Sequence, residues 1–151
     1  MRAGLSSALL ISAAWGLSGC PDGSLAPSVR PATLAIGFDH VCALRGGATT
    51  NEVVCWGDNS QGELGVAIGD RCLPVPGLSG VSQLAAAGNY ACALLNDGSV
   101  RCWGTMQQLL RTEPAPVVPP ALTDAIQISA GSHHTCALRA GGTLRCWATN
   151  S

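Results

Sequence analysis

Eight cysteines and three histidines are the residues of this 151-residue chain whose side chains could carry out chemistry. Cysteine thiolates bind metals, act as nucleophiles or form disulfides, and histidines serve as metal ligands or general bases. Six cysteines form three pairs, each joining a Cys-Ala-Leu to a later Cys-Trp: Cys42 and Cys55, Cys92 and Cys102, Cys136 and Cys146. This regular arrangement indicates a repeated structural unit that positions the cysteines.

The repeat extends well beyond the cysteines. Residues 34–44, 84–94 and 128–138 align on Cys-Ala-Leu without a gap, and each copy continues to its Cys-Trp pair. Internal repeats of this length are the sequence signature of architectures in which one small unit recurs along the chain. The cysteines of all three units are therefore expected to share one geometry.

Each unit is predicted to be a β-hairpin. The cysteines of the second and third copies lie symmetrically about Asn96-Asp97-Gly98 and Ala140-Gly141-Gly142, and the flanking residues alternate between apolar and polar. Three-residue turns that end in Gly suit a type I turn followed by a left-handed residue. Folding the hairpin puts the paired cysteines opposite each other, where Cα atoms about 4.5 Å apart permit a disulfide. The first copy has a longer turn over residues 46–52, and its ends can still meet. Each disulfide would contribute roughly 2–3 kcal/mol in the chain-entropy model.

Zinc binding is the alternative chemistry for these cysteines, because His133 and His134 lie close to Cys136. Structural zinc sites favour cysteines two to four residues apart, a spacing that the hairpin pairs lack. For an enzyme, Asp39 and His40 adjoin Cys42, and His133 and His134 adjoin Cys136, but these cysteines are better explained as paired. No G-x-S-x-G, H-E-x-x-H or Walker motif occurs. We expect structural disulfides, no metal, no cofactor and no enzyme activity.

The first twenty residues have the layout of a secretory signal peptide. Met1-Arg2 is a positive start, residues 3–17 are almost wholly apolar or small, and Leu17-Ser18-Gly19-Cys20 follows. The Leu-Ser-Gly-Cys run resembles the lipobox of bacterial lipoproteins, in which the cysteine receives a diacylglyceryl group and becomes the new N-terminus. We expect a signal helix over residues 1–19 and lipidation at Cys20, with pairing of Cys20 to another cysteine as the alternative.

The composition limits the environment and the partners. The net charge is −1, all eight basic residues are scattered arginines, and no basic stripe exists to bind a nucleic-acid backbone. Many cysteines and few large apolar side chains are typical of an exported chain that folds in an oxidising compartment. Residues 20–31, rich in Pro, Ser and Gly, are predicted to be a flexible tether. Cys72 has no assigned partner: it could be free, paired with Cys20, or separated from a partner in missing repeats.

The repeat resembles the regulator of chromosome condensation repeat. That family carries Gly-x-x-His-x-Cys-Ala-Leu, a turn, and then Cys-Trp-Gly-x-Asn-x-x-Gly-x-Leu-Gly. The first copy matches nearly all of it, with Gly37, His40, Cys42, Ala43, Leu44, Cys55, Trp56, Gly57, Asn59, Gly62, Leu64 and Gly65. The second copy departs from it, because Ala87 and Tyr90 replace the Gly and His and the Asn-x-x-Gly-x-Leu-Gly stretch is missing.

The resemblance implies an all-β fold, a β-propeller of four-stranded antiparallel blades. It places three repeats at residues 32–80, 81–124 and 125–151, the third incomplete. The implied strands are 33–36, 41–45, 53–56 and 73–75, then 83–86, 91–95, 100–103 and 116–118, then 125–129, 135–138 and 144–147. Propellers typically have 4–8 blades. We therefore expect a truncated member whose exposed blade edges could self-associate.

The resemblance also implies a function. Members of the family are protein-binding platforms, so we expect a non-catalytic binding or scaffold module with an unknown protein partner, lipid-anchored at the bacterial cell envelope. Nucleotide exchange on a small GTPase, the activity of some eukaryotic relatives, is one alternative, and a fragment without function is another.

Overall fold

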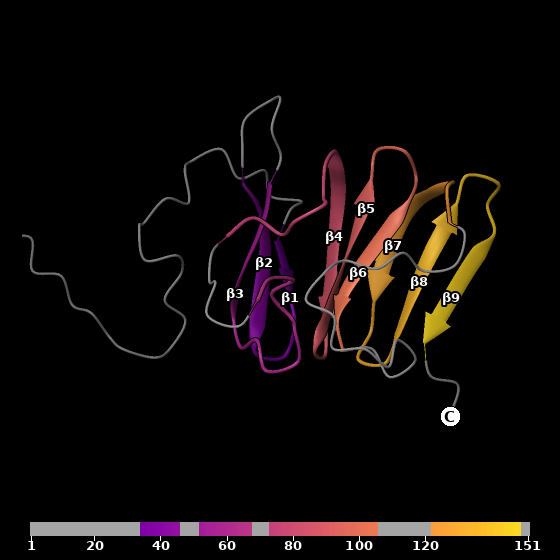
Figure 1. Ribbon diagram of the computed structural model, residues 1–151. Helices are drawn as coiled ribbons and strands as arrows, with labels where there is room; N and C mark the ends of the chain where they lie inside the picture. Colours follow the sequence, from indigo (N-terminus) through magenta and orange to yellow (C-terminus); the bar gives the residue numbers. More distant parts are fainter. Residues whose placement is uncertain (1–33, 46–51, 68–72, 106–121, 149–151) are drawn as a thin grey trace, which may run out of the picture.

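Nine strands in three antiparallel sheets make up the part of the chain that the computed structural model describes, residues 34–45, 52–67, 73–105 and 122–148. Each sheet has three strands in chain order, and we call the sheets the first, second and third blade (Figure 1). The strands are β1 Leu34–Ile36, β2 His40–Arg45 and β3 Glu52–Gly57; β4 Val81–Ala87, β5 Tyr90–Leu95 and β6 Val100–Gly104; β7 Ala125–Ala130, β8 His134–Arg139 and β9 Leu144–Ala148. The all-β expectation is confirmed.

The hairpins form as the repeat predicts, because the turn residues fix the register. Gly98 and Gly142 have φ of 77° and 78°, the left-handed conformation that a glycine adopts most readily. In the second blade the Gly98 N–H donates to the Leu95 oxygen at 3.0 Å. The Leu95 N–H in turn donates to the Ser99 oxygen at 2.9 Å, which closes the three-residue turn. The resulting register places Cys92 directly opposite Cys102.

Because side chains alternate along a strand, every blade has two distinct faces. The disulfide face carries the cysteine pair of the blade, such as Cys42 opposite Cys55. The tryptophan face carries the tryptophan one residue later, such as Trp56 opposite Val41. The names disulfide face and tryptophan face apply to the same positions in all three blades.

The blades stack so that the disulfide face of one packs on the tryptophan face of the next. Between the first two blades, Cys42 and Cys55 belong to a buried apolar cluster that contains Trp103 of the second blade. Between the second and third blades, Cys92 and Cys102 belong to a cluster that Trp147 packs against. The inner strands also contact each other, β1 with β4 and β4 with β7 (Figure 1). The core is therefore a series of repeated interfaces between blades.

The prediction of an outer strand at residues 73–75 is wrong. Only an isolated bridge pairs Pro74 with Val54, supported by the Val75 N–H donating to the Val53 oxygen at 2.8 Å. Proline has no N–H and cannot extend a ladder, which limits the pairing here. The blades therefore have three strands rather than four in the residues described.

Several expectations fall outside the described residues: the signal helix over 1–19, the tether over 20–31, Cys20, Cys72 and the strand at 116–118. Among the residues that are described, no helix is long and apolar enough to cross a membrane.

Candidate binding surface

Three disulfides join the strands of the hairpins, Cys42–Cys55, Cys92–Cys102 and Cys136–Cys146. Their Cα atoms lie 4.0 to 4.1 Å apart, as expected for residues directly opposite in an antiparallel pair. The first two lie in the blade interfaces, with every cysteine at most 1% exposed. In the third disulfide, Cys136 is half-buried and Cys146 is exposed. These cysteines are therefore structural crosslinks, and the described residues contain no group of three metal-binding side chains.

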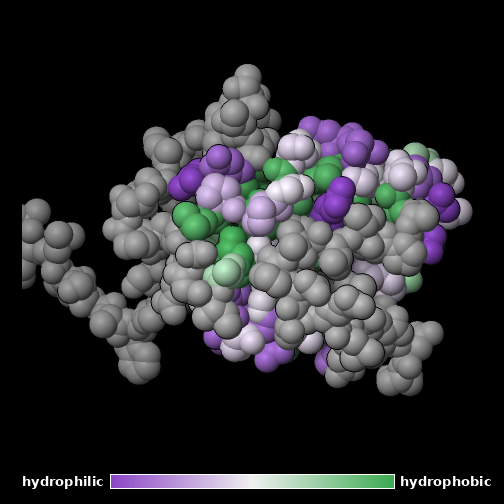
Figure 2. All heavy atoms as spheres, in the orientation of Figure 1, coloured by the Kyte–Doolittle hydropathy of each residue, from purple (hydrophilic) through white to green (hydrophobic). Residues whose placement is uncertain are grey.

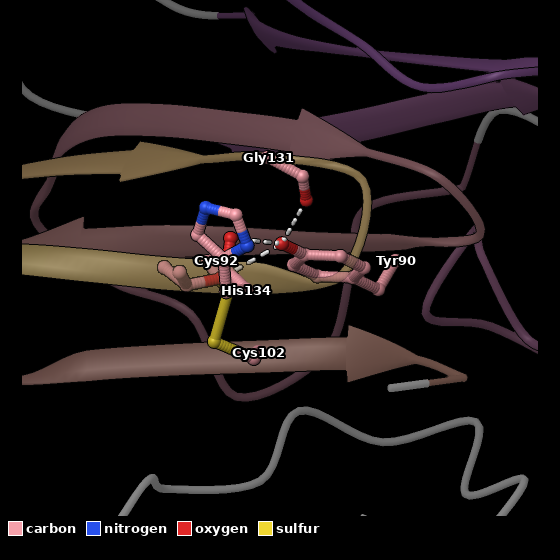
Figure 3. Close-up of a disulfide and its surroundings, with 6 residues drawn as sticks. Tyr90, Cys92, Cys102, Gly131 and His134 are labelled. Atoms are coloured by element: carbon pink, nitrogen blue, oxygen red, sulfur yellow. Dashed lines mark hydrogen bonds between the residues drawn. A yellow bond between two sulfur atoms is a disulfide. The ribbon is translucent and has the colours of Figure 1, made fainter. Parts of the chain in front are cut away.

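Tyr90 links the second blade to the third, although its column in the repeat is a histidine in the other two copies. Its hydroxyl donates toward the backbone oxygens of Gly131 at 2.7 Å and His134 at 3.0 Å (Figure 3). It also accepts a hydrogen bond from Thr135 Oγ1 at 2.9 Å. Burial raises the pKa of Tyr90, an effect that the Thr135 hydrogen bond only partly offsets, so the hydroxyl keeps its proton at neutral pH. The tyrosine thus positions the turn that precedes β8.

His40 occupies the same column in the first blade and makes the corresponding contact with the second. The side chain is 2% exposed, and its ring fills the space above Gly37, where any Cβ would overlap it. Burial lowers the pKa of His40, while a hydrogen bond to the Tyr90 backbone and the charges of Asp39 and Asp58 raise it less. His40 is therefore an uncharged packing residue, and its position does not suit a surface general base.

The segment after Trp56 folds into a loop that connects the first two blades. Asn59 organises it, since its side chain donates to the Val66 oxygen at 3.1 Å and accepts from the Leu64 N–H at 3.0 Å. Trp103 Nε1 of the second blade donates to the Glu63 oxygen at 2.8 Å. Burial raises the pKa of Glu63, and hydrogen bonds from the backbone offset this only in part. The Asn-x-x-Gly-x-Leu-Gly motif thus serves packing between blades.

Three turns form a continuous row at one end of the stack, and we call them the turn row: residues 37–39, 88–89 and 131–133. The Phe38 N–H donates to the Gly88 oxygen at 3.0 Å, and Gly88 lies so close to Ser132 that an added Cβ would stand 2.8 Å from the Ser132 oxygen. Residues that follow β3 and β6 also hydrogen-bond the turn row. The Asp58 N–H donates to the Asp39 oxygen at 2.7 Å, and the Thr105 N–H donates to the Asn89 oxygen at 2.9 Å.

The turn row presents an apolar side chain among polar ones. Phe38 is 68% exposed, and Asp39, Asn89, Ser132 and His133 are exposed beside it along the row. Figure 2 shows hydrophilic residues gathered toward the two ends of the strands and hydrophobic residues between them. An exposed aromatic ring on a rigid, polar rim is a feature of protein-binding surfaces. Sequence reasoning did not single out Phe38, since only the stacking of the blades brings the three turns together.

Known proteins share this architecture. A sequence model of the regulator of chromosome condensation (RCC1) repeat matches residues 81–108 and 125–150, the region of the second and third blades. Prp20p from Saccharomyces cerevisiae, whose structure is described with its binding to Gsp1p and histones, is 26% identical with a TM-score of 0.64, over 77% of this chain and 32% of that one. Yeast RCC1 (Prp20) bound to Kap60 is 26% identical with a TM-score of 0.60, over 76% of this chain and 28% of that one.

A third solved structure shows the fold alone. Human WBSCR16 is 24% identical with a TM-score of 0.63, over 77% of this chain and 33% of that one. No curated protein sequence matches the chain. The chain spans about a third of the length of these solved relatives. The second and third blades thus match the RCC1 repeat, and the three sheets of the described residues resemble the blades of RCC1-type β-propellers.

Proposed function

We propose that the chain is a non-catalytic protein-binding module whose turn row recognises a protein partner. The observation that carries the proposal is the exposed Phe38 ring on a row of turns that backbone hydrogen bonds hold in place across three blades. A rigid frame lowers the entropy lost when loops bind, which favours affinity. Solved structures of the similar yeast protein concern its binding to Gsp1p, histones and Kap60. This supports a binding role for the repeat, with a partner specific to this chain.

The proposal assigns no catalytic residue. The buried titratable groups all have structural explanations. The His40 ring packs against Gly37, the Glu63 carboxylate accepts from the Gln61 N–H at 2.8 Å within its loop, and the Tyr90 hydroxyl bonds the third blade. The Cys-Trp pairs and the Gly-x-x-His columns likewise act in stacking.

We further propose that the module works at the bacterial cell envelope, anchored by a lipid on Cys20. Three disulfides within single blades suit a chain that folds in an oxidising compartment, which supports export. The Leu17-Ser18-Gly19-Cys20 run supports lipidation. Labelling cells with radioactive palmitate tests this: the wild-type chain should take up label and a Cys20→Ala variant should not. An unlabelled wild-type chain would contradict the anchor.

Site-specific photo-crosslinking tests the turn row. A photoreactive phenylalanine analogue replaces Phe38 in one variant and Gly141, in the exposed β8–β9 turn at the opposite end, in the control. We expect a discrete crosslinked product with a different protein from position 38 and none from position 141. Equal products from both positions, or none from position 38 in cells that make the chain normally, would contradict binding through the turn row.

A further inference from the structure

The third blade exposes the kind of surface that the other two blades bury. Its disulfide face carries Leu144, which is 70% exposed, together with the exposed Cys146. The residues at these positions in the second blade are Val100 and Cys102, which are 0% and 1% exposed. Among the described residues, this face therefore lacks the neighbouring blade that covers the corresponding surface elsewhere.

The first blade exposes apolar residues of the opposite kind of face. Leu34 and Ile36 of β1 pair with Ala43 and Val41 on the tryptophan face of the blade, and they are 53% and 63% exposed. The centre of the same face, Ala43 opposite Val54, is buried, so the exposed apolar part of the face lies along β1. The residue in the Leu34 column of the third blade is Ile128, which is 2% exposed because it packs against the second blade. One chain thus exposes residues of both halves of an interface that it builds twice internally.

Polar links between blades follow the same pattern. The Gln83 side chain bonds the backbone of Ile128 in both directions, donating to its oxygen at 2.8 Å and accepting from its N–H at 2.9 Å. The residue in the Gln83 column of the third blade is again a glutamine, Gln127, and it is exposed. Leu34 of the first blade stands in the same column of the repeat as Ile128. If a first blade stacked on the third blade, Gln127 could therefore bond the backbone of Leu34 as Gln83 bonds that of Ile128.

The histidine column completes the set. Tyr90 of the second blade reaches the Gly131 and His134 oxygens of the third, and His40 stands in the same column of the first blade, 2% exposed. His134 stands in this column on the third blade and is exposed, with its ring beside Gly131 as the His40 ring lies beside Gly37. Its stacking partner on a further blade would be the backbone of the Gly37–His40 turn.

We propose that two copies of this chain associate head to tail. The disulfide face of the third blade in one copy (the tail) packs on the β1 side of the tryptophan face of the first blade in the other copy (the head). The contact is heterologous, and it closes into a ring if the rotation between copies allows. Two copies of three blades give six, within the range of about 4–8 blades that closed propellers have. The association adds a third use of an interface that the chain already forms twice.

Sedimentation velocity of the full chain with its disulfides formed tests the proposal. As concentration increases, we expect the mass to rise from that of one chain to that of a dimer or a longer head-to-tail oligomer. Leu144→Arg places a charge on the disulfide face of the third blade (the tail), and Ile36→Arg places one on the tryptophan face of the first blade (the head). Each variant alone should therefore stay monomeric. Leu73→Arg, at an exposed leucine beside the Pro74 bridge, is the matched control and should associate like the wild type.

Mixing the two variants gives the decisive result. Leu144→Arg keeps an intact head and Ile36→Arg an intact tail, so a mixture should form a one-to-one dimer although neither variant associates alone. Circular dichroism, together with a chain mass that shows all three disulfides formed, confirms that each variant is folded. A wild-type chain that stays monomeric, or a mixture that fails to form the dimer, would overturn the proposal.

Discussion

The Tyr90 hydroxyl offers a direct test of how the blades are held together. Replacing Tyr90 by phenylalanine keeps the buried ring and removes one donor and one acceptor. The donor serves the Gly131 and His134 oxygens, and the acceptor serves the Thr135 hydroxyl. A hydrogen bond contributes about 0.5–1.5 kcal/mol net, so the two lost bonds should lower the free energy of unfolding by about 1–3 kcal/mol. Thr135 is 0% exposed, so water cannot replace its lost partner and the cost should lie in the upper half of this range.

Urea unfolding of four chains measures this effect and its origin. The wild type, Tyr90→Phe, Thr135→Val and the double variant form a double-mutant cycle, and we expect a coupling energy of about 0.5–1.5 kcal/mol between the two hydroxyls. Thr123→Val, at an exposed threonine, controls for the loss of a hydroxyl in general. A Tyr90→Phe chain within about 0.5 kcal/mol of the wild type, or a cycle without coupling, would refute the reasoning.

Three further predictions follow from burial and backbone geometry. Mild reductant at low protein concentration should open Cys136–Cys146 first, because of the three disulfides only that one is accessible to an attacking thiolate. Alkylation of the freed thiols and mass spectrometry measure the rate at each pair. Equal rates at all three pairs would contradict the prediction. Burial lowers the pKa of His40 in the folded state, so the unfolded state binds more protons, and the free energy of unfolding should fall as pH drops below the ordinary histidine pKa of 6.5. In urea titrations at several pH values, His40→Gln should reduce this pH dependence. An unchanged pH profile would count against the prediction. Gly57→Ala should destabilise by about 1–3 kcal/mol, because Gly57 has a φ of 114° and lies against the backbone of Asp39 and His40. Gly141→Ala, where an added Cβ meets nothing within 4 Å, should be nearly neutral in the same thermal melts.

The repeat in the sequence predicted the hairpins because it combines two local signals. Gly98 and Gly142 mark the ends of three-residue turns, and the cysteines lie symmetrically about them. Since turn geometry fixes register within a hairpin, these signals were enough to place Cys92 opposite Cys102. The strand expected at residues 73–75 failed because Pro74 limits the ladder to a single bridge.

The contacts between blades could not be predicted in the same way. Gln83 and Ile128 lie 45 positions apart, and no local pattern indicates that an amide will bond a distant backbone. Tyr90 stood out in the sequence as a departure from the histidine column, and the structure shows that it makes the link to the next blade through a hydroxyl instead of a ring nitrogen. Phe38 gave no signal, because its setting depends on three turns that meet only in the stacked array.

The disulfides also bear on how the chain acquires its covalent structure during synthesis. Each joins two cysteines only 10 or 13 positions apart, within one hairpin. A hairpin of this size closes within microseconds, far faster than a disulfide forms, so the two cysteines of each pair already face each other when they are oxidised. A dithiol oxidase is then sufficient for these three bonds, and we expect them to form correctly in cells that lack a disulfide isomerase. Each hairpin would thus acquire its own crosslink independently of the other two.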